Sequence, residues 1–193
     1  MALVESTMLA LGTAAPDFLL PDVVSGKTIS LRDFTGKKAL LVMFICRHCP
    51  YVVHVKSELA KLGNDYAKKD VGIVAISAND VSTHPDDAPA QLAAMAKEEG
   101  FTFPFCYDEA QAVAAAYTAA CTPDFFLFDA NRRLVYRGQL DDSRPGNGKP
   151  LTGNDLRAAL EAALAGKPVA ADQRASIGCS IKWVPGREPA YAR

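Results

Sequence analysis

The sequence has no long hydrophobic run and no excess of one charge. No apolar stretch among its 193 residues reaches the roughly 18 residues that a membrane-spanning helix needs. Its 21 Lys and Arg residues balance 22 Asp and Glu residues, whereas a nucleic-acid-binding protein usually has a basic excess or stripe. No Lys or Arg precedes the first apolar residues, which is unlike a secretory signal peptide. We therefore expect a cytoplasmic protein that binds neither nucleic acid nor membranes.

The cysteine pairs that build a disulfide framework or a structural zinc site are also missing. The cysteines are odd in number and unevenly spaced, which argues against a structural disulfide framework. One Cys-x-x-Cys pair is present, and structural zinc usually needs a second. The five cysteines, which are candidates for working thiols, are Cys46, Cys49, Cys106, Cys121 and Cys179.

The composition and the apolar runs predict one α/β domain over residues 1–193. Hydrophobic residues make up 49% of the chain and charged residues 22%, close to the average of soluble globular proteins. Residues 38–45 and 71–77 are continuous apolar runs, as expected for strands buried on both faces. Residues 125–129 and 134–137 flank a polar turn, which predicts a β-hairpin.

Helices are predicted between and after these strands. After Pro50 the apolar residues recur on one helical face, and proline is favourable in a first helical turn. Further helices are predicted over residues 89–99, 109–119 and 154–165. This alternation of strands and helices predicts a layered sheet covered by helices.

The two ends of the chain are expected to add to this core. Residues 15–34 predict a short hairpin that precedes it. Residues 167–193 contain several Gly and Pro residues and predict an irregular C-terminal tail. Ile177, Ile181 and Trp183 are apolar enough to dock this tail on the core.

The strongest functional signal is the segment 46–50, Cys-Arg-His-Cys-Pro, between a predicted strand and a predicted helix. Unpaired backbone N–H groups and the positive end of the helix dipole favour a thiolate at a helix start. Arg47 and a protonated His48 add positive charge, and thiols in such settings have pKa values of about 3.5–7.5. Cys49 should face inward and leave Cys46 accessible. We therefore predict Cys46 as the attacking thiol and Cys49 as the resolving thiol.

Other interpretations of the cysteines stay open. His54 and Cys179 could complete a scattered metal site with Cys46 and Cys49, or this pair could lie buried together by chance. The two remaining cysteines are predicted to lie in the core, Cys106 because its sequence neighbours are apolar and Cys121 because a cysteine is more often a small core residue than a reactive one.

Strings along nearly the whole chain resemble a known family. Residues 15–18, 30–34 and 36–38, followed by the strand and the cysteine pair, are similar to the alkyl hydroperoxide reductase/thiol-specific antioxidant (redoxin) branch of the thioredoxin superfamily. The resemblance implies a thioredoxin-like fold, a central mixed β-sheet flanked by helices, with an N-terminal β-hairpin extension. The finer match is to a peroxiredoxin-like subgroup with a Cys-x-x-Cys motif, through residues 46–52, 122–126, 136–145 and 176–183.

Departures from peroxiredoxins decide which reaction we expect. Peroxiredoxins carry a Thr three residues before the peroxidatic cysteine, where this chain has Cys46. They also carry a later Arg, and the segment where it would fall, residues 121–123, is Cys-Thr-Pro in this chain. Without these groups to polarise the O–O bond, Cys49 lacks preorganisation for peroxide reduction. We therefore predict a thiol-disulfide oxidoreductase that cycles Cys46 and Cys49 between dithiol and disulfide. An antioxidant thiol peroxidase with a peroxidatic Cys49, and a copper or zinc module using these cysteines and a histidine, are alternatives.

The resemblance to thioredoxins also suggests partners and further site residues. It implies a cis peptide bond before Pro123, opposite the cysteine pair, where a free backbone edge can pair with a substrate. The buried acid of thioredoxins is Leu40 here, so His48 or Asp141-Asp142 could accept the proton of the resolving thiol. The expected partners are disulfide or thiol substrates, protein or small-molecule, and a recycling thiol reductase, with no cofactor. Cys179 is either a packed cysteine or a third exchanging thiol. Together, the candidate auxiliary residues are Arg47, His48, Thr122 and Cys179.

Overall fold

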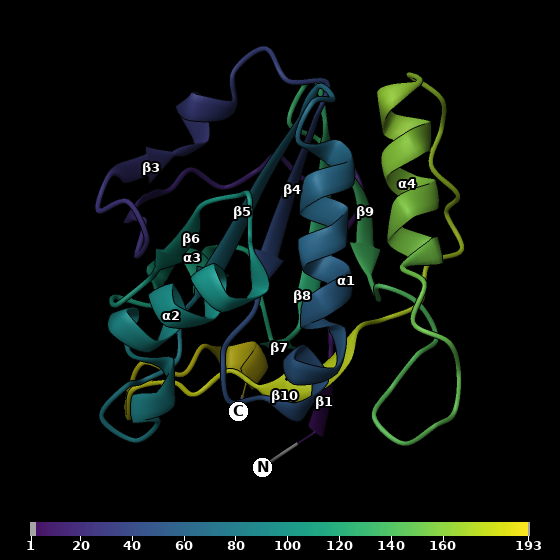
Figure 1. Ribbon diagram of the computed structural model, residues 1–193. Helices are drawn as coiled ribbons and strands as arrows, with labels where there is room; N and C mark the ends of the chain where they lie inside the picture. Colours follow the sequence, from purple (N-terminus) through teal and green to yellow (C-terminus); the bar gives the residue numbers. More distant parts are fainter. Residues whose placement is uncertain (1–2, 193) are drawn as a thin grey trace.

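A mixed five-stranded sheet forms the centre of the molecule. The structure, a computed structural model, describes residues 3–192. Neighbouring strands are parallel from β6 to β4 and antiparallel from β4 to β9, which confirms the predicted mixed sheet (Figure 1). In spatial order, the strands are β6 (Phe105–Tyr107), β5 (Val71–Ser77), β4 (Ala39–Phe44), β8 (Asp124–Asp129) and β9 (Leu134–Gly138).

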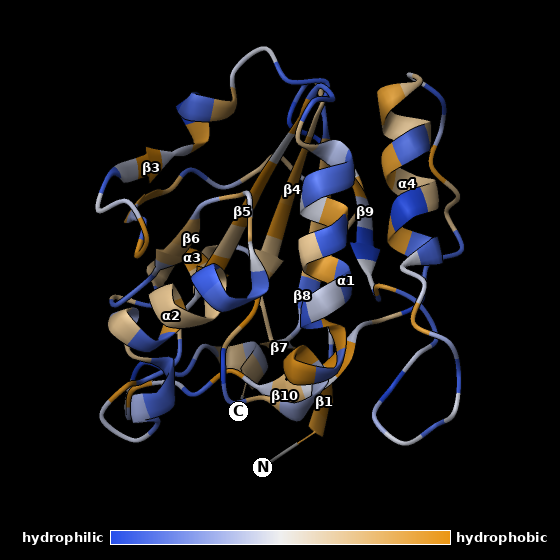
Figure 2. Cartoon of the chain, viewed as in Figure 1, coloured by the Kyte–Doolittle hydropathy of each residue, from blue (hydrophilic) through white to orange (hydrophobic). Residues whose placement is uncertain are grey.

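Both faces of this sheet are buried, as the continuous apolar runs predict. Alternate side chains of a strand point to opposite faces. In β4, Leu41 and Met43 enter the core on one face, and Leu40 and Phe44 enter the core on the other. Figure 2 shows the resulting hydrophobic central strands beside helix α1, which alternates polar and apolar residues.

Helices cover both faces, as the predicted layered architecture requires. Helices α1 (Pro50–Tyr66), α2 (Pro89–Glu99) and α4 (Asn154–Leu164) pack on the face of Leu41 and Met43. The opposite face is covered by α3 (Ala112–Ala116), the hairpin β2–β3 and a 3-10 turn (Leu31–Phe34). The predicted N-terminal hairpin is therefore present, with strands β2 (Leu19–Pro21) and β3 (Thr28–Ser30). No helix described over residues 3–192 combines the length and the apolar character needed to cross a membrane.

Helix α3 is shorter than the predicted helix over residues 109–119. Gln111 has a φ of 61°, so the helix begins only after it. Its side-chain amide donates hydrogen bonds to the carbonyl oxygens of Ala78 and Lys182, which fix the unusual backbone. Thr118, just after the helix, has a φ of 51°, so the helical conformation does not continue past it. Tertiary contacts thus override the helical propensity of this Ala-rich segment.

The prediction of a wholly irregular C-terminal tail is wrong. Strand β10 (Ile177–Ser180) lies in the middle of a second sheet, between β1 (Leu3–Glu5) and β7 (Cys121–Thr122). The backbone of β10 finds hydrogen-bond partners on both sides, one from each end of the sequence, which a local reading of the tail does not reveal. The tail does dock on the core, since Ile181 is buried and Trp183 packs against the α3 side. The sheet lies below the N-terminus of α1 in Figure 1.

Candidate functional site

The cysteine pair lies at the junction between β4 and α1. Cys49 is the N-cap residue of α1, with Pro50 in the first turn, so the helix begins directly after the pair. Both Cys46 and Cys49 are 0% exposed. The expectation that Cys46 stays accessible is therefore wrong, because Thr122 lies against its sulfur and the buried Asp87 holds the next residue of the segment. All five cysteines carry thiols.

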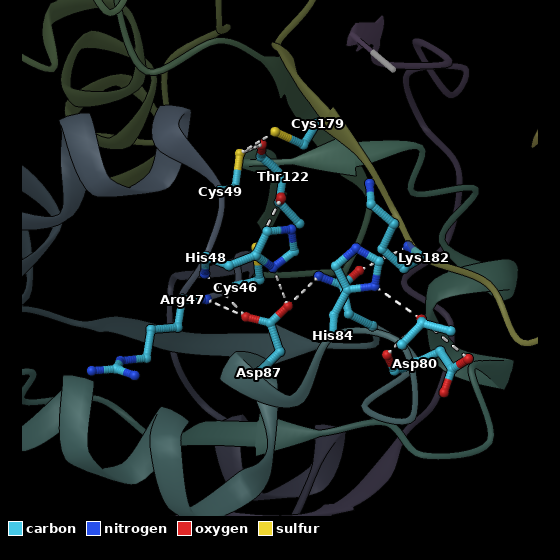
Figure 3. A network of polar contacts seen from close by, with 12 residues as sticks. Cys46, Arg47, His48, Cys49, Asp80, His84, Asp87, Thr122, Cys179 and Lys182 are labelled. Atoms are coloured by element: carbon cyan, nitrogen blue, oxygen red, sulfur yellow. Dashed lines mark hydrogen bonds and ion pairs between the residues drawn. The ribbon is translucent and has the colours of Figure 1, made fainter. Parts of the chain in front are cut away.

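The loop that carries Pro123 lies opposite this pair. The Thr122–Pro123 peptide bond is cis, as predicted. The Thr122 hydroxyl lies 3.2 Å from the Cys46 sulfur, and the Thr122 carbonyl oxygen lies 3.1 Å from the Cys49 sulfur. Thr122 thus contacts both cysteines, one through its side chain and one through its backbone (Figure 3).

A third cysteine joins the pair from the second sheet. The sulfurs of Cys49 and Cys179 lie 2.8 Å apart and point toward each other in Figure 3. Cys179 is placed by the register of β10, in which it pairs with Thr122. Gly178 allows β10 to lie close to Thr122, because a Cβ atom at position 178 would lie 2.0 Å from the Thr122 carbonyl oxygen. Of the two interpretations of Cys179, the structure favours a thiol within reach of the pair.

The negative charge of this cluster is held best by Cys49. A hydrogen bond from the Cys46 thiol lowers the pKa of Cys49 to about 4 against the effect of burial, with further hydrogen bonds from Cys179 and the N–H of Val52. Burial raises the pKa of Cys46 well above its ordinary value. The neutral Cys49 thiol instead donates to the Thr122 carbonyl oxygen. The favoured thiolate therefore lies at the helix N-terminus, where unpaired N–H groups and the helix dipole stabilise an anion.

Asp87 organises the segment between the two cysteines, and sequence reasoning missed it. One of its carboxylate oxygens accepts hydrogen bonds from the backbone N–H groups of Arg47 and His48, at 2.7 and 3.2 Å. The other lies 2.5 Å from His48 Nδ1 and accepts a hydrogen bond of 2.7 Å from the Asn79 side chain. Asp87 is 0% exposed. Burial opposes its ionisation, but the hydrogen bonds from His48 and Asn79 outweigh burial and lower the pKa of Asp87.

His48 is the ring partner of Asp87. The hydrogen bond to Asp87 raises the pKa of His48, against the opposing effect of burial. The His84 ring packs on His48 with centroids 4.8 Å apart. Burial, followed by the charge of His48, lowers the pKa of His84, so the second ring favours the neutral form. Arg47 extends away from the sulfurs and donates to the Gln91 side chain (Figure 3).

The remaining candidate residues lie outside this cluster. Asp141 accepts hydrogen bonds from the backbone N–H groups of Ser143, Thr152 and Gly153, so it organises the 141–153 loop instead of accepting a proton from a thiol. His54 contacts the same loop through the Ser143 hydroxyl, 2.8 Å away. Two cysteines are buried in the core, as predicted: Cys106 and Cys121.

One group of side chains has the composition of a metal site. Ligand atoms of Cys46, His48 and Asp87 lie within 4.8 Å of one another. Both carboxylate oxygens of Asp87 already accept hydrogen bonds, so an ion would have to displace at least one of these donors. These residues fit an organised hydrogen-bond network better than a metal centre. The predicted scattered site differs from this group, because His54 lies with the 141–153 loop.

Sequence comparison identifies the family to which these features belong. Residues 10–160 match the Redoxin family. The chain belongs to the redoxin family. The predicted enzyme class, an oxidoreductase of the thioredoxin superfamily, is confirmed by this membership.

Solved and curated relatives agree with this assignment. An uncharacterized conserved protein from Geobacillus kaustophilus is 53% identical, with a TM-score of 0.94, over 96% of this redoxin chain and 98% of the relative. The thiol-disulfide oxidoreductase ResA of Geobacillus thermodenitrificans is 30% identical over 132 residues, which are 67% of this chain and 70% of that protein. The thioredoxin domain of a thiol-disulfide oxidoreductase from Bacteroides vulgatus is 23% identical, with a TM-score of 0.56, over 70% of this chain and 90% of that domain. This last likeness concerns the fold, which is thioredoxin-like as predicted.

Proposed function

We propose that this redoxin is a thiol-disulfide oxidoreductase whose working pair is Cys46 and Cys49. The observation that carries the proposal is the placement of two vicinal thiols at a helix N-terminus, opposite Thr122 and Pro123. The name of the relative ResA, which matches about two thirds of the chain, supports the same activity.

In the proposed reaction, the Cys49 thiolate begins the exchange. It attacks one sulfur of a substrate disulfide, forms a mixed disulfide with that sulfur and releases the other as a thiolate. The Cys46 thiol then loses its proton to the released thiolate and attacks the Cys49 sulfur. This step forms the Cys46–Cys49 disulfide and releases the second substrate thiolate, so the substrate gains two electrons and the enzyme loses two. A thiol reductase returns the pair to the dithiol.

The proposal reverses the roles that the sequence predicts for the two cysteines. It is supported by the hydrogen bonds that lower the pKa of Cys49, which come from the thiols of Cys46 and Cys179 and from the backbone N–H groups of Val52 and Cys179, whereas burial dominates at Cys46. Because both sulfurs are buried, the substrate has to displace part of the surrounding loops before attack. The segments around Thr122, His84 and Cys179 lie close to the pair (Figure 3).

A trapping experiment with cysteine variants tests both the function and the roles. A variant with both Cys46→Ser and Cys179→Ser, in which neither neighbouring thiol can resolve it, should accumulate a mixed disulfide through Cys49 when it is mixed with a protein disulfide such as insulin. Cys49→Ser should accumulate none, and Cys106→Ser should turn over like the unmodified protein. Trapping by Cys49→Ser alone would restore the roles predicted from the sequence. Absence of insulin reduction by the unmodified protein would show the proposed function to be wrong.

A thiol peroxidase is a second candidate, favoured by the lowered pKa of Cys49. In that reaction the Cys49 thiolate would take one oxygen of a peroxide to form a sulfenic acid and release an alcohol or water. Cys46 would then attack this sulfur, expel water and form the same disulfide. Against it, Arg47 extends toward Gln91 and leaves the sulfur without its guanidinium. Stopped-flow mixing with hydrogen peroxide distinguishes the candidates, since we expect oxidation no faster than that of a simple thiolate.

The cellular location and the partners follow as part of the proposal. We propose protein disulfides as substrates, a thiol reductase as the recycling partner and the cytoplasm as the compartment. Cell fractionation followed by alkylation of free thiols tests the location, because a cytoplasmic protein should be recovered with Cys46 and Cys49 mainly reduced.

A further inference from the structure

The three sulfurs of the cluster are arranged around Cys49. Thr122 contacts both Cys49 and Cys46, at 3.1 and 3.2 Å, and the Cys49 sulfur lies 2.8 Å from that of Cys179. A disulfide bond is about 2.05 Å long, so the two sulfurs need to approach by only about 0.8 Å. Cys49 therefore has two candidate bonding partners, which are Cys46 in the same Cys-x-x-Cys motif and Cys179 on β10.

We propose that Cys179 is a third redox thiol, which exchanges with the Cys46–Cys49 disulfide to form a Cys49–Cys179 disulfide. This inference rests on the proposed function, because it needs the Cys46–Cys49 disulfide as its starting state. The Cys179 thiolate attacks the Cys49 sulfur, the Cys46–Cys49 bond breaks, and Cys46 leaves as a thiolate. The proton lost by Cys179 is taken up by Cys46. The protein is neither oxidised nor reduced, so the step needs no further reactant.

The fold holds Cys179 in place for this attack. Its strand, β10, is paired on both sides, with β1 and with β7. Gly178 brings the strand against the Thr122 carbonyl, and Thr122 in turn contacts both other cysteines. The third thiol is therefore positioned by regular backbone pairing and not by a loose tail.

The charge state of the cluster favours attack only after the pair is oxidised. In the dithiol, burial, followed by the hydrogen bond to Cys49 and its negative charge, raises the pKa of Cys179 to about 12. Once Cys49 is bonded to Cys46, it carries no negative charge, so two of these three causes disappear. Lys182, two residues beyond strand β10, has the opposite effect and lowers the pKa of Cys179. Oxidation of the pair thus prepares Cys179 as a nucleophile.

This exchange would give the enzyme two disulfide isomers that differ in which cysteine keeps its thiol. In one isomer Cys179 is a thiol, and in the other Cys46 is a thiol beside the Thr122 hydroxyl. The second isomer is equally oxidised, but in it Cys46 is again a thiol. A recycling reductase could then attack a disulfide between α1 and β10 rather than one within the 46–49 segment.

Tryptic mapping without reduction tests the proposal directly. Cleavage after Arg47 separates Cys46 from Cys49, and each thiol of the cluster falls in its own peptide, 39–47, 48–56 or 175–182. The protein is oxidised with diamide, its remaining thiols are alkylated in acid, and the linked peptides are counted by mass spectrometry. We expect both the 39–47/48–56 link and the 48–56/175–182 link in the unmodified protein.

Single variants separate the proposal from the proposed function. Cys179→Ser should keep only the 39–47/48–56 link, and Cys106→Ser should behave like the unmodified protein. In Cys46→Ser, diamide can join Cys49 and Cys179 only by direct oxidation, so the 48–56/175–182 link in this variant reports how close the two thiols lie. If the unmodified protein forms the 39–47/48–56 link and reduces insulin but forms no 48–56/175–182 link, the third-thiol proposal is wrong and the function stands. If the unmodified protein forms no 39–47/48–56 link and reduces no insulin, the function itself is wrong, and the exchange with it.

Discussion

The five thiols of this redoxin are all buried, yet they fall into two groups. Cys106 lies in β6 within the core, where burial raises its pKa to about 12. Burial also raises the pKa of Cys121, in β7. In the second group, Cys49 has a pKa lowered to about 4 because Cys46, Cys179 and a backbone N–H donate to it. Burial alone therefore does not decide the reactivity of a thiol, whereas the donors that meet it do.

The donors around Cys49 come from segments far apart in the sequence. Cys46 follows the end of β4, Cys179 lies in β10, and the N–H of Val52 belongs to the first turn of α1. Cys106 lies among apolar side chains of the core, whereas the Cys121 thiol donates to the Pro123 carbonyl oxygen. The proposed function thus belongs to the place where the end of β4, the start of α1 and strand β10 meet, and each prediction below removes one part of that place.

The largest effect is expected when the central thiol itself is removed. Cys49→Ser should lower disulfide exchange by at least about 100-fold, because serine is a poor nucleophile at neutral pH and forms no disulfide. Cys106→Ser is the matched control, with a buried thiol of the other group. Insulin reduction measured for both variants gives the comparison. Equal losses in the two variants would remove the distinction between the groups.

A smaller effect is expected from the carboxylate that holds the 46–49 segment. Asp87→Ala leaves the N–H groups of Arg47 and His48 without their acceptor, which costs about 1–3 kcal/mol for each group that stays buried. Asp86→Ala, at the exposed neighbouring position, should change little. Urea unfolding gives the free energies, and insulin reduction shows whether the cysteine pair is still positioned. A stable but inactive Asp87→Ala variant would make Asp87 a positioning residue only.

Displacement of β10 should weaken the link between Cys179 and Cys49. Gly178→Ala places a Cβ atom 2.0 Å from the Thr122 carbonyl oxygen, so the strand has to shift, at a cost of about 1–3 kcal/mol. The 48–56/175–182 link should decrease while the 39–47/48–56 link is kept. Ser180→Ala, on the same strand, is the control. An unchanged yield of both links would show that the register of β10 does not position Cys179.

The sequence predicts the apolar scaffold well and the polar network poorly. The runs at 38–45 and 71–77 are β4 and β5, because strands buried on both faces have an unambiguous pattern. The cysteine pair is predictable from its spacing before a helix, and Pro123 from the resemblance to thioredoxins. Asp87 carries no such signal, since its partners lie about forty positions away and only the fold brings them together.

The C-terminal segment is a second case in which partners distant in sequence decide the structure. Residues 177–180 contain glycine and small residues and resemble a loop, yet they form β10 because β1 and β7 flank them. The prediction of an accessible Cys46 is wrong for the same reason, since Thr122, which contacts its sulfur, is distant in sequence. Local pattern places an element, but long-range pairing decides what surrounds it.

The smallest effect concerns the pH dependence of the His48–Asp87 pair. Folding raises the pKa of His48, so its contribution to stability is complete below about pH 6.5, its unfolded value, and is lost as the pH rises through the folded value. Folding lowers the pKa of Asp87, so its contribution is complete above about pH 3.9 and is lost as the pH falls. The pair should therefore stabilise the fold most between these two values. Asp87→Asn keeps the shape but not the charge, and urea unfolding at pH 5.5 and pH 8.5 should show the larger loss at pH 5.5. The loss at pH 5.5 should exceed that at pH 8.5 by about 1 kcal/mol, because the ion pair is partly buried. Equal losses at both pH values would mean that Asp87 stabilises the fold through its hydrogen bonds alone, without a contribution from the charge of His48.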